Sequence, residues 1–408
     1  MFENPIRSAW QNAICNRALL TLFAALFLIN LSIPIAIVVR FGLSTFGQYS
    51  LLCAIGSFVA LFMDAGGRTQ IERSFASLTG RARYIHYLIV FPTVLLAFVV
   101  TNAISVRLQE FLPLIFATFM FEVFFELNLA NRRASGQLLS DARMRILRKA
   151  ALLVGIFLVS AENASLMELI QIHLGCNVFL TVFTLPQTSS RTNKPKPREK
   201  VSSSKQLFIG KLYIFVTGLT VFLYQKLPYA YAEVFKTPFE TFGMIVLVYK
   251  LHEAASFFAT PIGNLILQRM KETVKLSNAD LTGKKSLTNI LTLGLGLSLF
   301  SFLLLIVVIG SSVFKISFSD IFNWFAISAC FPFMFLNLYF SKALVVLHFD
   351  RLQCLTFVAA FMICVLLSVS IISLSGLPIF LVGVLIFELC LTLAFLTYWR
   401  LGWLSKKF

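Results

Sequence analysis

The chain has 408 residues, of which 58% are hydrophobic and 13% are charged, whereas soluble domains average about 45–50% apolar and about 25% charged residues. This composition excludes a soluble globular protein. About twelve membrane spans of about 20 residues each would use roughly 240 positions and leave no room for a separate catalytic domain.

Apolar runs long enough to span a bilayer occur in both halves of the chain. In the first half they cover residues 19–39, 47–66, 85–105, 111–130, 149–161 and 166–185. In the second half they cover residues 208–228, 240–264, 288–312, 321–341, 353–374 and 377–398. A backbone in lipid must satisfy its own hydrogen bonds, so each run is predicted to be a helix, kinked where it contains proline. The first run is too long for a signal peptide and is predicted to stay as a span.

The basic residues are distributed unevenly over the connections between these runs. Most of the 35 lysines and arginines fall in alternate connections and at the termini. The opposite connections contain only Arg40, Arg107, Lys226, Lys236 and Lys315. Cytoplasmic loops are enriched in Lys and Arg, so both termini are predicted to be cytoplasmic. This bias also explains the net charge of +17 without nucleic acid.

A polar, basic segment divides the chain into two halves. Residues 186–206 contain Pro195 and Pro197 among lysines, arginines and serines, which is typical of a flexible linker. Residues 1–185 and 207–408 are then predicted to form two all-α lobes of six helices each. An even number of spans implies a parallel repeat with a pseudo-twofold axis along the membrane normal. Thr-Phe-Gly opens a predicted span in each half, at 45–47 and at 241–243, and supports duplication.

Charged residues in the first lobe are candidates for function, because charges inside spans are costly and usually face a cavity or a partner. Asp64 and Arg68 are four residues apart and share a helical face, which indicates either a local ion pair or a contact at a cavity mouth. Glu122 and Glu126 also share a face. Two neighbouring carboxylates in a low dielectric cannot both ionise cheaply, so they predict a proton relay unless arginines such as Arg132 or Arg133 neutralise them.

In the second lobe, the sequence VLVYKLHEAASFF places three ionisable residues near the middle of a predicted span. Lys250 and Glu253 are three residues apart and can form a pair, whereas His252 points to another face. Lys250 is predicted to line a substrate or ion path, and a structural pair with Glu253 is the alternative. The isolated His173, His348 and Glu388 are expected to be packing or interfacial residues.

Motifs of enzymes and of ATP-driven transporters are absent from the sequence. There is no phosphate-binding glycine loop with lysine, no HExxH and no GxSxG. The seven cysteines lie in the N-terminal segment or within apolar runs, and no Cys/His spacing suits zinc or haem. We therefore predict no cofactor, no metal site and no enzymatic activity.

The start of the chain resembles a known family of membrane proteins. Residues 46–49 (FGQY) stand at the end of a short external loop, residues 64–66 (DAG) lie at the inner end of the second span, and a basic segment begins at Arg68. This pattern resembles polysaccharide flippases of the Wzx type, within the multidrug/oligosaccharidyl-lipid/polysaccharide exporter superfamily. Residues 236–258 resemble the equivalent region of the seventh and eighth spans. The resemblance implies a central cavity, with these residues as cavity candidates: Arg40, Asp64, Arg68, Lys250 and Glu253.

The resemblance also implies an activity and partners. The expected activity is movement of an undecaprenyl-diphosphate-linked oligosaccharide from the cytoplasmic to the periplasmic leaflet of a bacterial inner membrane, in O-antigen or other surface polysaccharide biosynthesis. Cation coupling would involve Glu122, Glu126 and His252, and polymerase and chain-length proteins of the same pathway would be partners. Three alternatives stay open: a drug exporter of the same superfamily, a membrane glycan polymerase or ligase, and a non-transporting scaffold.

Overall fold

The computed structural model describes residues 5–64, 108–134, 138–159, 164–184, 204–255, 284–310, 317–346 and 349–400. These residues are helical apart from short turns and helix ends, and no strand occurs among them. The chain divides into two compact units, Met1–Lys200 and Val201–Phe408. The boundary between the units lies within the basic segment 186–206, whose predicted role as a linker stays a prediction.

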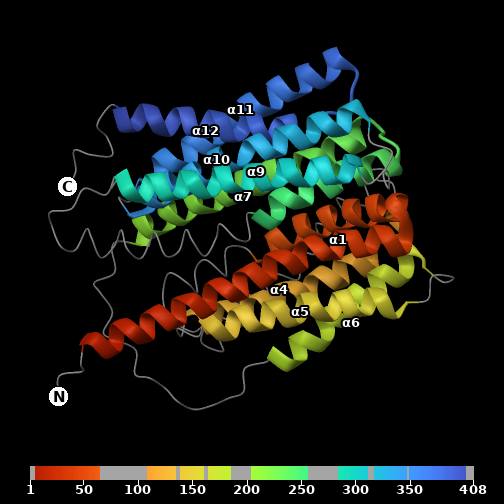
Figure 1. Cartoon of the computed structure of the whole chain (residues 1–408), viewed down its shortest axis with the longest axis horizontal. Coiled ribbons are helices and arrows are strands. Elements are labelled where there is room, and N and C mark those ends of the chain that lie inside the picture. Colours follow the sequence, from red (N-terminus) through yellow and green to blue (C-terminus); the bar gives the residue numbers. More distant parts are fainter. Residues whose placement is uncertain are drawn as a thin grey trace. The chain divides into compact units, whose positions relative to one another are not determined.

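The described residues of the first unit form four long helical elements, drawn in red to yellow-green in Figure 1. They are α1 (Pro5–Asp64), α4 (Leu112–Ala134, preceded by a 3-10 turn at Gln109–Phe111), α5 (Leu138–Leu158) and α6 (Leu166–Thr184). α1 consists of two helices joined at Gly42, where φ is 84° and ψ is 164°. Glycine tolerates this backbone conformation because it has no Cβ. The break therefore separates the first two predicted runs without a long loop.

The second unit contains helices drawn in green to blue (Figure 1). They are α7 (Ser204–Val234), a helix over residues 239–255, α9 (Lys284–Gly310), α10 (Phe318–Val346), α11 (Asp350–Ser375) and α12 (Val382–Arg400). α11 ends at Gly376, which has a φ of 64° and donates its backbone N–H to the Ile372 carbonyl at 3.0 Å. This is the usual left-handed cap of a helix C-terminus.

Every predicted apolar run except 85–105 overlaps a helix in the described residues; residues 85–105 and the ends of several other runs lie outside them, and the run 377–398 becomes helical only from Val382. Within the part of the chain that the structure describes, six helical segments are long and apolar enough to cross a membrane: Ala24–Leu61, Gln109–Ala130, Leu166–Thr184, Phe318–Ser341, Arg351–Ser375 and Val382–Arg400. The predicted class, an all-α polytopic membrane fold, is confirmed. One assignment is corrected: Lys226, which was counted with the external connections, lies inside α7, and this helix continues to Val234.

The two units repeat one packing pattern. In the first unit α4 packs on α6, α5 packs on both of them, and α1 packs on α5 and α6. In the second unit α10 packs on α12, α11 packs on both of them, and α7 packs on α11 and α12. The mutual packing of α4, α5 and α6 thus corresponds to that of α10, α11 and α12, and α1 and α7 each contact the last two helices of their set. This correspondence supports the duplication that the Thr-Phe-Gly repeat indicates.

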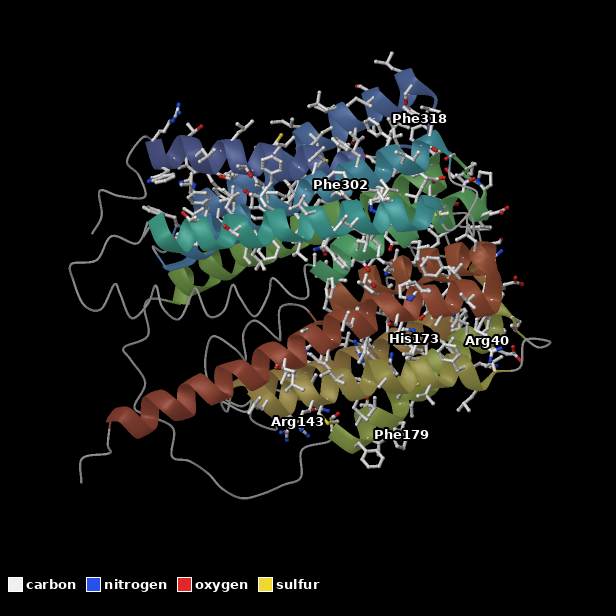
Figure 2. The ribbon with its side chains drawn as sticks, viewed as in Figure 1. Arg40, Arg143, His173, Phe179, Phe302 and Phe318 are labelled. Carbon is white, nitrogen blue, oxygen red and sulfur yellow. The ribbon has the colours of Figure 1, made fainter. Side chains whose placement is uncertain are left out.

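Large apolar side chains project from the outer surfaces of both units. Phe179 points away from α6 (Figure 2) and packs on Phe183 with ring centroids 4.5 Å apart. Leu158 and Leu374 are 80% and 88% exposed. Exposed apolar surface on this scale is unfavourable in water, whereas hydrocarbon side chains are the natural contacts of lipid tails. The exposed surface is therefore that expected of membrane-embedded helices.

Candidate functional site

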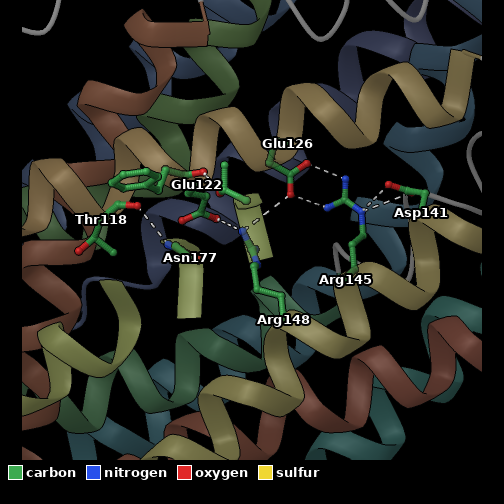
Figure 3. Close-up of polar contacts among 9 residues, drawn as sticks. Thr118, Glu122, Glu126, Asp141, Arg145, Arg148 and Asn177 are labelled. Carbon is green, nitrogen blue, oxygen red and sulfur yellow. Dashed lines mark hydrogen bonds and ion pairs between the residues drawn. The ribbon is translucent and has the colours of Figure 1, made fainter. Parts of the chain in front are cut away.

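The first unit holds a network of acidic and basic side chains between α4 and α5 (Figure 3). Arg145 donates two hydrogen bonds to Glu126, from Nη1 to Oε1 at 2.9 Å and from Nη2 to Oε2 at 2.7 Å. Its Nε also donates to Oδ1 of Asp141, one turn earlier on α5, at 3.3 Å. Arg148 Nη1 lies 3.0 Å from Oε1 of Glu122 and 4.0 Å from Oε1 of Glu126. The paired spacings Glu122/Glu126 and Arg145/Arg148 place both pairs on facing helical surfaces.

The described partners of the two glutamates are thus arginines of α5, and the side chain of Arg133 lies outside the described residues. Arg132 donates instead to the Ser140 hydroxyl at 2.8 Å. A bidentate arginine binds an ionised carboxylate in its preferred geometry, so the contacts of Glu126 favour its charged form. Neutralisation by arginines is the alternative to a proton relay, and the ion pairs of Arg145 and Arg148 give it a geometric basis. A role of Glu122 and Glu126 in ion coupling stays a prediction.

Buried hydrogen bonds join α6 to α1 and α4. Asn177 Nδ2 donates to the Thr118 carbonyl at 3.1 Å, and Thr181 Oγ1 donates to the Phe121 carbonyl at 3.0 Å. His173 Nδ1 and the Tyr49 hydroxyl are 2.9 Å apart. These contacts satisfy polar groups inside an apolar unit, where unpaired ones are expensive. His173 is accordingly a partnered packing residue, as expected from the sequence.

The remaining cavity candidates of the first unit are placed differently. Arg40 Nη2 donates to the Phe157 carbonyl at 3.1 Å, and its guanidinium lies 5.8 Å from the centroid of the Phe157 ring. The contact connects α1 to the end of α5 near the edge of the unit (Figure 2). Asp64 is the last residue of α1; its side chain, and Arg68 altogether, lie outside the described residues.

In the second unit, three charged residues meet between α7 and the helix 239–255. Lys250 forms an ion pair with Glu253, the alternative to the predicted role in lining a path, which stays a prediction. Lys226, from α7, lies 3.5 Å from Oε1 of the same carboxylate and 5.0 Å from the centroid of the Tyr229 ring. About a quarter of each side chain is exposed. The structure thus brings a second lysine to the pair. Spacing along one helix could not indicate this contact, because Lys226 and Glu253 lie on different helices.

Glu388 lies inside the second unit and is held by hydrogen bonds. Tyr224 donates its hydroxyl to Oε1 at 2.8 Å, and Asn337 Nδ2 donates to Oε2 at 2.6 Å. Thr392 in turn donates to Oδ1 of Asn337 at 2.9 Å. His252 is 1% exposed and packs beside Tyr224. These contacts draw α7, the helix 239–255, α10 and α12 together around one buried polar region.

Comparison with known proteins finds this fold among solved structures. No protein-family model and no curated protein matches the chain.

Three solved structures do match, and each alignment covers 96% of this chain. One is described as the outward-facing conformation of a multidrug resistance MATE family transporter of the MOP superfamily, with 10% identity, 95% of its chain covered and a TM-score of 0.60. Another is a MATE in complex with MaL6, with 11% identity, 95% covered and a TM-score of 0.57. A third, described as protein A, has 15% identity, 96% covered and a TM-score of 0.63. The chain therefore has the fold of MATE transporters.

Proposed function

We propose that this protein is a secondary transporter that moves an amphipathic solute across a membrane by alternating access. The observation that carries the proposal is the shared fold along nearly the whole of this chain and of MATE transporter structures. Fold alone does not fix a substrate. The substrate class has to be argued from the charged side chains.

The pair Lys226 and Lys250 supports a substrate with an anionic group. Both ammonium groups approach the carboxylate of Glu253 and all three side chains are partly exposed. A phosphate oxygen can replace a carboxylate oxygen as the partner of a lysine, since lysine binds phosphate as a point charge. We therefore infer that the substrate is a lipid-linked oligosaccharide whose diphosphate competes with Glu253 for the two lysines. It would move from the cytoplasmic to the periplasmic leaflet of a bacterial inner membrane, with both termini of the protein cytoplasmic.

Export of organic cations is the second candidate function. It is favoured by the solved structure described as a multidrug resistance transporter. In that case Glu253 would contact the cationic solute, and the lysines would be released from it. The two candidates predict opposite roles for the same three residues.

A reconstituted assay separates the candidates. The full chain is placed in liposomes that contain a fluorescent undecaprenyl-diphosphate-linked oligosaccharide, and its accessibility to a membrane-impermeant quencher is followed under an imposed proton or sodium gradient. Ethidium uptake is measured in the same vesicles. Movement of the lipid-linked glycan without ethidium uptake is the expected result. Ethidium uptake alone would establish the exporter, and movement of neither compound would contradict transport.

A further inference from the structure

Three side chains of metal-ligand type converge inside the second unit. His252 comes from the helix 239–255, Cys330 from α10 and Glu388 from α12. One ligand atom of each residue lies within 4.8 Å of the others. Their exposures are 1%, 0% and 4%. Because the three residues come from separate helices, no short sequence motif could have predicted that they meet.

His252 provides an independent sign that this place holds a ligand. Neither Nδ1 nor Nε2 has a hydrogen-bond partner among the described residues. Its ring instead stacks on Tyr249, with centroids 5.4 Å apart and an interplanar angle of 16°, and meets the edge of Tyr224. A buried polar group without a partner costs about 1–3 kcal/mol, and such groups are rare in native proteins. A bound ion would satisfy one ring nitrogen directly.

Glu388 is positioned as the carboxylate ligands of metals are. Its two oxygens accept hydrogen bonds from Tyr224 and Asn337, and Asn337 is fixed by Thr392. Hydrogen bonds from neighbouring residues that do not themselves bind the metal orient its ligands, and they are a regular feature of metal sites. They fix the carboxylate plane and leave further lone pairs on each oxygen available, because an ionised carboxylate accepts about four hydrogen bonds.

We propose that His252, Cys330 and Glu388 bind a thiophilic divalent metal ion of the zinc class. Zinc takes Cys sulfur at about 2.3 Å, and His nitrogen and carboxylate oxygen at about 2.0–2.2 Å, in a tetrahedron. These bond lengths put the ligand atoms roughly 3.3–3.8 Å apart. Side-chain rotations that move the ligand atoms by about an ångström would therefore close the site around the ion. A fourth position stays open for water or a further donor.

The charges of this site balance. A divalent ion with one thiolate, one carboxylate and one neutral imidazole has no net charge, and a neutral assembly is what a buried site tolerates. Binding expels the Cys330 thiol proton to solvent, as thiolate ligation requires. Sodium or magnesium would not use this donor set, because hard cations select oxygen ligands. The bound ion would tie the helix 239–255 to α10 and α12, whatever solute the protein moves.

Metal binding to the purified full chain in detergent tests the proposal. After treatment with a chelator, Co²⁺ is titrated as an optical probe and Zn²⁺ is measured by elemental analysis. We expect about one zinc per chain, a sulfur-to-cobalt charge-transfer band and the intense visible bands of tetrahedral cobalt, all lost on addition of excess Zn²⁺. Zinc should also raise the thermal unfolding temperature of the wild-type chain. Absence of bound metal in the wild-type chain would overturn the proposal.

Variants assign the ligands. Cys330→Ser should abolish the charge-transfer band, and His252→Gln and Glu388→Gln should each weaken zinc binding at least tenfold. Cys354→Ser is the matched control, because Cys354 is also a buried cysteine in the second unit but lies outside the cluster, and it should bind zinc as the wild-type chain does. Folding is checked by size-exclusion chromatography. A charge-transfer band that persists in folded Cys330→Ser would assign the metal to another place and overturn the proposed site. If none of the three cluster variants folds, the wild-type chain decides: an unfolding temperature that zinc does not raise would also overturn the proposal.

Discussion

The ion pairs of the first unit connect side-chain chemistry to stability. Arg148 is 8% exposed and faces Glu122 and Glu126, while Arg145 makes the bidentate contact to Glu126. Removing one member of a buried ion pair leaves an uncompensated charge, at a cost of about 3–5 kcal/mol. The network is therefore a place where structural and functional roles can be separated by paired substitutions.

Arg148→Met should lower the thermal unfolding temperature of the purified protein, because it leaves Glu122 without its guanidinium partner. Adding Glu122→Gln should restore most of the loss. The control is Arg143→Met on the same helix, which removes an exposed arginine and should change stability by less than about 0.5 kcal/mol. Equal unfolding temperatures for Arg148→Met and Arg143→Met would show that the ion pair of Arg148 does not stabilise the protein.

The same double variant tests the predicted role of Glu122 in ion coupling. If Glu122 only neutralises Arg148, Arg148→Met with Glu122→Gln should transport at the wild-type rate once folding is restored. If Glu122 carries a proton, the double variant should be stable and inserted but lose the part of transport that depends on a pH gradient. The measurement is transport with and without the gradient in liposomes of equal protein content.

At the scale of the elements, α9 and α10 approach each other closely at a glycine. A Cβ placed on Gly294 would lie 2.7 Å from the Pro332 Cα, whereas one on Gly296 would meet nothing within 4 Å. Beyond this point, Ser301 and Ser328 share a hydrogen bond of 2.7 Å, and Trp324 Nε1 donates to the Ser301 carbonyl at 3.0 Å. Small residues at helix interfaces allow such contact in membrane proteins.

Gly294→Ala should therefore destabilise the second unit. The added methyl group overlaps backbone that cannot move as a side chain does, and overpacking of this kind costs about 1–3 kcal/mol. Gly296→Ala, two residues further on the exposed face, should be neutral or slightly stabilising, because alanine favours helix by about 0.5–1 kcal/mol. Thermal unfolding of the two variants in one detergent makes the comparison. Equal unfolding temperatures would contradict the close packing of α9 on α10.

The helices were largely predictable from the sequence, whereas their partners were not. Length and apolarity locate the spans because lipid imposes both requirements on each segment separately. The pair Lys250 and Glu253 was also predictable, since it depends on spacing within one helix. The contacts of Glu126 with Arg145 and of Glu253 with Lys226 depend on how different helices pack. The same limit hid the group of His252, Cys330 and Glu388.

At the scale of the whole molecule, the two units and the basic residues predict one orientation in the membrane. A reporter that is active only in the periplasm should be inactive when fused after residue 196 and active when fused after residue 236. The reason is that residues 186–206 are rich in lysine and arginine, which favours the cytoplasmic side. Cell fractionation must show equal amounts of both fusions in the membrane. The reverse pattern of activity would invert the topology.

We propose that a solute crosses the membrane through contact with Lys226 and Lys250. The most direct test is the rate at which the fluorescent lipid-linked oligosaccharide moves across the membrane of liposomes. Four proteins are compared: the wild type, the double variant Lys226→Ala/Lys250→Ala, the triple variant that adds Glu253→Ala, and the single variant Lys236→Ala. Lys236 is the matched control because it is an exposed lysine of the same unit, paired with Glu233.

We expect the double and the triple variants to lose at least nine-tenths of the transport rate at normal protein content, because the positive charges themselves contact the diphosphate, and we expect Lys236→Ala to match the wild type. If the lysines served only to neutralise Glu253, the triple change would leave no buried charge uncompensated. Wild-type transport by the triple variant would therefore contradict the account.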